Sequence, residues 1–135
     1  EMNMSKEEKK KKEEMRRVLH EKREAIVKEI EEHIGSHMST ALLQKFDSAL
    51  DDGDISVLSL GEGIDYKLLE MKYKEYKSIA DAFRKLDAGT YGACEECGNE
   101  IDEKRLKVIP FARLCIECKR KQEELEEIEK ERGLE

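Results

Sequence analysis

The chain has 135 residues, of which 44% are charged and 38% hydrophobic, with no Trp and a single Pro. This composition excludes a thick globular core and favours long, solvated helices in one domain or in one small domain with an extension. The net charge of −7 argues against direct, sequence-specific DNA binding, because phosphate neutralisation supplies most of that affinity. No apolar run reaches the roughly 18 residues that span a bilayer. We therefore expect a soluble, cytoplasmic protein without membrane contact.

The first part of the chain is predicted to form one long helix from about Ser5 to Leu50. Its residues up to Ile34 are mostly Lys, Glu, Arg and long aliphatics, which are good helix formers. Apolar residues recur at steps of four and seven before Gly35 and at steps of four after it, as on one helix face. They are Met15, Leu19, Ile26, Ile30, Met38, Leu42, Phe46 and Leu50. We expect this helix to be weakest near Gly35.

An acidic, glycine-rich segment follows from Asp51 to Gly63 (DDGDISVLSLGEG). We expect a turn or an irregular helix start there, with Asp54 or Ser56 as a cap. A second helix is predicted from Asp65 to about Gly89, where glycine suits the left-handed position just past a helix end. Its apolar residues step by four and three, which is the spacing of a coiled-coil seam: Leu69, Tyr73, Tyr76, Ala80 and Phe83. The simplest assembly folds this helix back on the first as an antiparallel hairpin.

A third helix is predicted from about Ile116 to Glu131, dense in Lys and Glu. Its apolar anchors are few, mainly Ile116, Leu125 and Ile128. We therefore expect a solvated helix that packs on one side only.

All four cysteines lie in one short stretch as C-x2-C-x17-C-x2-C: Cys94, Cys97, Cys115 and Cys118. This spacing matches a tetrahedral four-thiolate zinc site, and Gly98 follows the second cysteine where such a turn often needs a positive φ. Two disulfides would require an oxidising compartment, and a redox Cys-x-x-Cys centre would require a thioredoxin-like context. We therefore expect one Zn²⁺ per chain.

This zinc is expected to be structural. Four cysteine ligands close the coordination shell and leave no position for water, so catalysis by the metal is not expected. The three histidines, His20, His33 and His37, lie far back on the first helix and outside any known zinc-binding motif. We expect them to be surface residues.

The window between Lys45 and Lys67 contains no basic residue. Its acidic residues are Asp47, Asp51, Asp52, Asp54, Glu62 and Asp65. A hairpin folded near residues 51–56 puts these acids tens of ångströms from the zinc, at about 1.5 Å of rise per helical residue. Two interpretations stay open: a polar turn, or a probe that presents carboxylates to a cationic or metal-containing site on a partner.

The string G-x-Y-G-x-C-x-x-C-G-x-x-I, from Gly89 to Ile101, resembles the finger signature of the DksA/TraR family of bacterial transcription factors. Arg105-Leu106, Pro110 and the closing C-I-E-C-K add to the likeness, which extends over about residues 51–119. The resemblance implies an all-α fold with a long antiparallel coiled-coil hairpin, a four-cysteine zinc-binding head and a C-terminal helix. Residues 1–88 would form the hairpin with an acidic tip near 51–56, and residues 89–135 the zinc finger and the last helix.

Family members insert the hairpin into the secondary channel of RNA polymerase, and their tip carries Asp-x-x-Asp-x-Ala. In the ungapped register from Cys94, the tip falls here on Asp51, Asp54 and Ser56, so this chain reads Asp-x-x-Asp-x-Ser. The resemblance thus implies a non-enzymatic regulator that binds RNA polymerase and alters the stability of promoter open complexes. The alternative is a transcript-cleavage factor similar to GreA. One hairpin accounts for the apolar stripes, so we expect a monomer.

Members of the DksA type act together with guanosine tetraphosphate. The family's basic contacts to this alarmone fall here on Ser78, Ile109 and Lys119, and only Lys119 is basic. The resemblance therefore makes Lys119 the candidate alarmone contact and guanosine tetraphosphate a candidate second partner.

Overall fold

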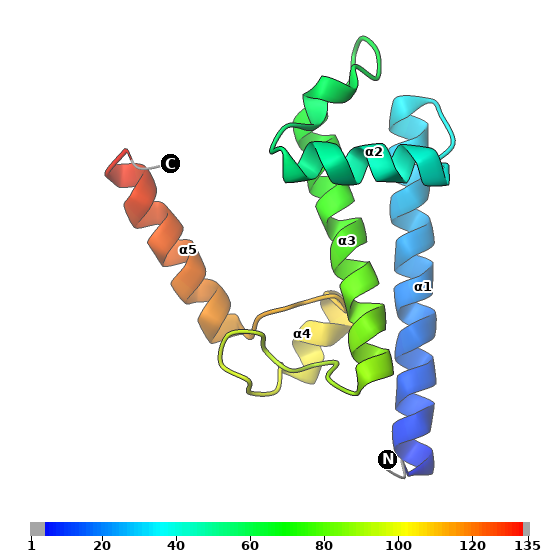
Figure 1. Ribbon diagram of the computed structural model, residues 1–135. Coiled ribbons are helices and arrows are strands. Elements are labelled where there is room, and N and C mark those ends of the chain that lie inside the picture. Colours follow the sequence, from blue (N-terminus) through cyan, green and yellow to red (C-terminus); the bar gives the residue numbers. More distant parts are fainter. Residues whose placement is uncertain (1–4, 134–135) are drawn as a thin grey trace.

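The computed structural model describes residues 5–133, which form five α-helices and one 3₁₀ helix (Figure 1). Their bounds are α1 (Lys6–Ile34), α2 (Thr40–Asp51), η1 (Ile55–Leu58), α3 (Tyr66–Ala88), α4 (Glu103–Val108) and α5 (Ile116–Glu131). Within residues 5–133 the only β pairing is an isolated antiparallel bridge between Ala93 and Glu100. The predicted all-α fold is confirmed, and the predicted bounds of the last helix are those observed.

α1 and α3 run antiparallel along most of their length and form a rod (Figure 1). The buried apolar stripe of α1 joins that of α3 in one hydrophobic core. Glu29 of α1 pairs with Lys72 of α3 at 3.2 Å, and the guanidinium of Arg23 lies 4.7 Å from the centre of the Phe83 ring. The predicted hairpin of the first and second helices is therefore confirmed.

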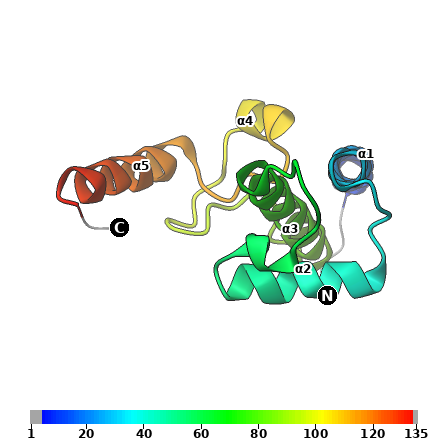
Figure 2. The same ribbon diagram turned by 90° about the horizontal axis from the view of Figure 1, so that it is seen from above.

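The single long helix predicted from Ser5 to Leu50 is wrong, because the chain breaks into α1 and α2. Gly35 ends α1 in the left-handed region, with φ 69°, and donates its N–H to the carbonyl of Glu31. Ser39 then caps α2 by accepting a hydrogen bond from the N–H of Leu42 at 3.1 Å. The two caps, four positions apart, turn the chain, so that α2 crosses one end of the rod (Figures 1 and 2).

α2 is fastened to α3 by an aromatic and polar cluster. Phe46 is fully buried and stacks on Tyr73, with ring centroids 5.0 Å apart. The Tyr73 hydroxyl donates to Asp47, whose carboxylate also pairs with Lys77 at 3.0 Å. The hydrogen bond from Tyr73 is the main cause that lowers the pKa of Asp47, and Lys77 adds to it against the effect of burial. The carboxylate of Asp47 is therefore ionised in the folded protein at neutral pH.

Replacing Tyr73 with Phe removes this hydrogen bond and keeps the ring stack. We expect a loss of about 1.5 kcal/mol of unfolding free energy at pH 7, the low end of the range for a hydrogen bond to a charged group, because the Asp47 side chain is partly exposed. The pKa of Asp47 in the folded protein lies below its usual value of 3.8. The ionised carboxylate therefore contributes its full share of the unfolding free energy above pH 3.8, and this share is lost as the pH falls through the lowered pKa. Urea unfolding of wild type and Tyr73→Phe at pH 7 and pH 3 measures this. An equal difference at both pH values would contradict the assignment.

The hydrophobic residues form two clusters. The larger lies among α1, α2, η1 and α3, and the smaller contains Cys94, Ile101 and Leu106 in the head. Tyr91 packs against both clusters. The division into units 1–88 and 89–135 stays a prediction, and its outermost residues, 1–4 and 134–135, lie outside the described residues.

α5 was expected to pack on one side, and this expectation is wrong. It extends away from the rod (Figures 1 and 2), and none of its residues is buried. Leu125 and Ile128 remain 61% and 47% exposed, because two apolar side chains among glutamates offer too little surface to hold a helix against a neighbour. No helix formed by residues 5–133 is both long and apolar enough to cross a membrane.

Candidate functional site

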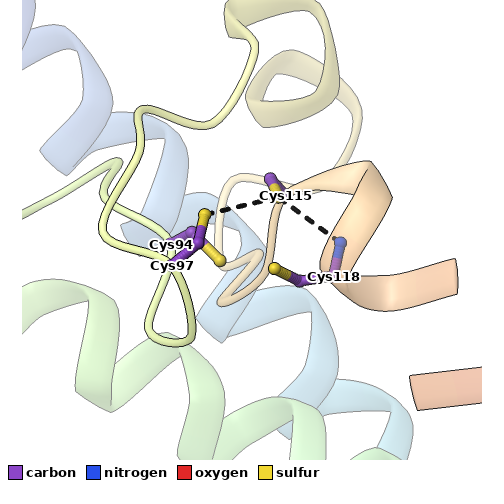
Figure 3. A group of neighbouring side chains, drawn as sticks. All are labelled: Cys94, Cys97, Cys115 and Cys118. Carbon is purple, nitrogen blue, oxygen red and sulfur yellow. Dashed lines mark hydrogen bonds between the residues drawn. The ribbon is translucent and has the colours of Figure 1, made fainter. Parts of the chain in front are cut away.

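The four cysteines come from two separate segments and point toward a common centre (Figure 3). Cys94 and Cys97 belong to the loop between α3 and α4, and Cys115 and Cys118 to the start of α5. Cys94 is buried and Cys97 is exposed, with the other pair in between. The predicted ligand set is therefore brought together in the folded chain.

The first Cys-x-x-Cys pair sits on a tight turn. The Cys94 carbonyl accepts from the N–H of Gly98 at 3.0 Å, and the Cys94 N–H donates to the carbonyl of Asn99 at 2.8 Å. Gly98 has φ 79°, the positive value expected at this position. The Ala93–Glu100 bridge closes the base of the turn. Local backbone bonding thus directs both sulfurs to the same side.

The second pair is placed by a helix start. Cys115 is the N-cap of α5, and its sulfur accepts from the N–H of Cys118 at 3.5 Å. Cys118 lies in the first turn of the helix, so the cap itself sets the distance between the two sulfurs. α4, which was not predicted, occupies part of the span between the pairs and buries Leu106 against the finger.

The sulfur geometry fits a zinc ion. All four Sγ atoms lie within 4.8 Å of one another, and those of Cys97 and Cys115 are 3.9 Å apart. Tetrahedral zinc with Zn–S bonds of about 2.3 Å requires sulfurs about 3.8 Å apart. Four thiolates at this spacing hold one structural Zn²⁺ and leave no coordination position for a substrate.

The ionisation of the cysteines shows why this cluster needs a cation. Burial opposes ionisation of Cys94, yet backbone N–H groups, chiefly that of Cys97, lower its pKa to about 6. The pKa of Cys118 is raised to about 12, first by its hydrogen bond with the Cys115 sulfur and then by burial. The thiolate of Cys94 therefore forms readily, and the raised pKa of Cys118 means that its proton leaves when a metal balances the charge.

An ion-pair network joins the finger to the rod, and no motif in the sequence indicates it. Glu95 pairs with Lys85 of α3 at 2.5 Å and with Arg113 at 3.1 Å. Lys85 is the largest cause that lowers the pKa of Glu95. The Tyr91 hydroxyl also donates to the carbonyl of the buried Pro110 at 2.6 Å. Because Glu95 lies between the first two cysteines, the metal turn is tied directly to α3.

The predicted tip residues lie at the end of the rod opposite the head, in the segment where α2 leads into η1 (Figure 1). Asp51 is the last residue of α2 and is exposed, and Asp54 is the N-cap of η1. Gly53, with φ 88°, makes the turn between them. α3 has 23 residues and at about 1.5 Å per residue separates this segment from the head by about 35 Å.

Ser56 holds the carboxylate of Asp54. Oδ1 of Asp54 accepts from the Ser56 hydroxyl at 2.6 Å and from the Ser56 N–H at 3.0 Å. These two bonds, the hydroxyl first, lower the pKa of Asp54. The expectation of a cap at Asp54 is confirmed, and the same contact keeps this carboxylate ionised in a fixed orientation.

The three positions assigned to the alarmone lie on different elements. Ser78 is on α3, Ile109 ends α4, and Lys119 is on α5 directly after the last cysteine. The Lys119 ammonium lies 3.5 Å from the side-chain oxygen of Gln122. The role of Lys119 stays a prediction.

The zinc finger and the overall fold are similar to those of known proteins. The model of the prokaryotic dksA/traR C4-type zinc finger matches residues 89–124. The solved structure of transcription factor DksA2 from Pseudomonas aeruginosa is 30% identical, with a TM-score of 0.59 over 86% of this chain and 85% of that one.

Two curated relatives match shorter stretches. A protein of Aquifex aeolicus is 38% identical over 80 residues, which is 59% of this chain and 51% of that protein. The RNA polymerase-binding transcription factor DksA of Haemophilus influenzae is 46% identical over 46 residues, 34% of this chain and 32% of that protein. The chain thus spans about half or less of the length of these two relatives.

Proposed function

Because the chain belongs to the DksA/TraR family, we propose that it is a transcription regulator that binds RNA polymerase and is not an enzyme. The rod would enter the secondary channel of the polymerase and alter the stability of promoter open complexes. The observation that carries this proposal is the placement of two exposed, acidic positions at the end of the rod remote from the zinc head. A relative from Haemophilus influenzae carries polymerase binding in its name.

The head and the rod would divide the work. The zinc finger forms the base from which the hairpin projects, and the Glu95 network fixes that base to α3. Asp51 and Asp54 would act at the polymerase active site through their charge. Ser56 would act indirectly, because its hydroxyl orients the Asp54 carboxylate. Lys119 is proposed as the residue of the head that contacts guanosine tetraphosphate.

The test neutralises the tip without changing its shape. Asn is as good an N-cap as Asp, so Asp54→Asn keeps η1 capped, and Asp51→Asn is isosteric on an exposed position. We expect the double variant to bind polymerase like the wild type and to lose the effect on open complexes. The measurement is the half-life of open complexes at a ribosomal RNA promoter with the cognate polymerase, with and without guanosine tetraphosphate.

Asp52→Asn is the matched control, because Asp52 is an exposed acid that lies between the two tip positions in the chain. It should behave as wild type. A double variant that still shortens or extends the half-life would show that the acids are only turn residues. Shortening of RNA in backtracked complexes would instead support the cleavage-factor alternative. Lys119→Ala, measured with and without guanosine tetraphosphate, tests the contact proposed for that residue.

A further inference from the structure

Two side chains near the end of α1 accept hydrogen bonds from the segment that carries the acidic tip, one at each end of that segment. His33, in the last turn of α1, accepts a hydrogen bond on Nε2 from the backbone N–H of Asp65 at 2.9 Å. Asp65 is the N-cap of α3, and its own carboxylate accepts from the N–H of Leu68 at 3.1 Å. The start of α3 is therefore bonded to the end of α1 across 32 residues of chain.

Glu31, two residues earlier, binds the start of the same segment. Its Oε2 accepts from the backbone N–H of Met38 at 2.8 Å and lies 2.9 Å from Nδ1 of His37. Met38 itself is buried. The corner between α1 and α2 is thus fixed by one carboxylate, in the same turn of α1 as His33.

We infer that Glu31 and His33 are positioning residues for the acidic tip. The segment from Met38 to Asp65 contains α2, η1 and the loop that follows, and both of its ends are bonded to side chains of one helical turn. Each bond fixes one backbone N–H at an end of the segment. Loss of either bond therefore lets that end of the segment change its direction relative to the rod. The orientation of the tip acids on the rod therefore depends on these two side chains.

The bond at His33 has a strict chemical requirement. Nε2 accepts a hydrogen bond only when it carries no proton, so the imidazole is neutral with its proton on Nδ1. Gln offers an amide oxygen that can accept in the same way, whereas Leu fills similar space without any acceptor. For Glu31, Gln keeps an oxygen for the Met38 N–H and Ala removes it. Each position therefore has a variant that keeps the bond and one that deletes it.

The first measurement is amide exchange with water by NMR at pH 7.5, on the full zinc-loaded chain. We expect His33→Leu to raise the exchange rate of the Asp65 amide about tenfold, the equivalent of one lost hydrogen bond. Exchange in η1 should rise as well, while the middle of α3 stays unchanged. His33→Gln should restore both. Glu31→Ala and Glu31→Gln should show the same contrast at Met38. His20→Leu is the matched control, because the polar partners of His20 among residues 5–133, Arg23 and Glu24, belong to its own helix.

The second measurement rests on the proposed function, namely the open-complex half-life. His33→Leu should bind polymerase normally and weaken the effect, and His33→Gln should recover it. Unchanged exchange in η1 for both deletion variants would overturn the inference, whatever the transcription result. A full transcription effect in His33→Leu, beside an inactive Asp51→Asn/Asp54→Asn protein, would also overturn it and leave the proposed function intact. Exchange changes without any activity of the wild type would contradict only the proposed function.

Discussion

Loss of the zinc ion is expected to unfold the head and to leave the α1–α3 rod helical. Among the described residues, the buried hydrophobic cluster of the head is formed by Cys94, Ile101 and Leu106, and it is too small to fold a segment of this length unaided. Zinc bound by four thiolates supplies an apparent free energy of about 10–16 kcal/mol. The core of the rod lies in another cluster, among α1, α2, η1 and α3.

Cys97→Ala is the sharpest variant for this prediction. Cys97 is exposed, so its replacement deletes a ligand with little effect on packing, and Glu96→Ala next to it is the control. The variant should lose bound zinc, and the amide signals of residues 90–115 should collapse toward random-coil positions while those of α1 and α3 remain. Treatment of the wild type with a chelator should give the same spectrum. Cooperative unfolding of the whole chain would contradict this result and the boundary predicted at residue 88.

The sequence was sufficient where structure depends on near neighbours. The two Cys-x-x-Cys pairs, the positive φ of Gly98, the cap at Asp54 and the end of α3 at Gly89 all follow from local rules of turns and caps. The apolar stripes also gave the α1–α3 pairing, because a seam of fixed period can bury its residues in few ways.

The sequence did not predict those features of the fold that depend on contacts between residues far apart in the chain. A continuous helix through Gly35 and a broken one have similar local signals, and the broken form is the one in which α2 contacts α3. Those contacts are the Phe46–Tyr73 stack and the Asp47–Tyr73 hydrogen bond, which join residues 26 or more positions apart. The pairing of Glu95 with Lys85 depends in the same way on how the head meets the rod.

α2 ends at the tip, and Phe46 is its large, fully buried side chain in contact with α3. Its ring stacks on that of Tyr73 with an angle of 28° between the ring planes. Phe46→Ala deletes the ring and leaves a cavity between α2 and α3. We expect the unfolding free energy to fall by about 3–5 kcal/mol. Urea unfolding followed by circular dichroism measures the loss.

Two controls separate this effect from a general one. Phe46→Leu keeps most of the apolar contact and should cost clearly less than the Ala variant. Leu125→Ala removes a side chain that is 61% exposed on α5, and a surface substitution of this kind changes stability by no more than about 0.5 kcal/mol. A loss below about 1 kcal/mol in Phe46→Ala would mean that α2 does not pack on α3 in solution, since a collapsed or absent contact leaves no cavity to penalise. The acids after α2 would then have no fixed position on the rod, and the role proposed for them in the polymerase channel would be contradicted.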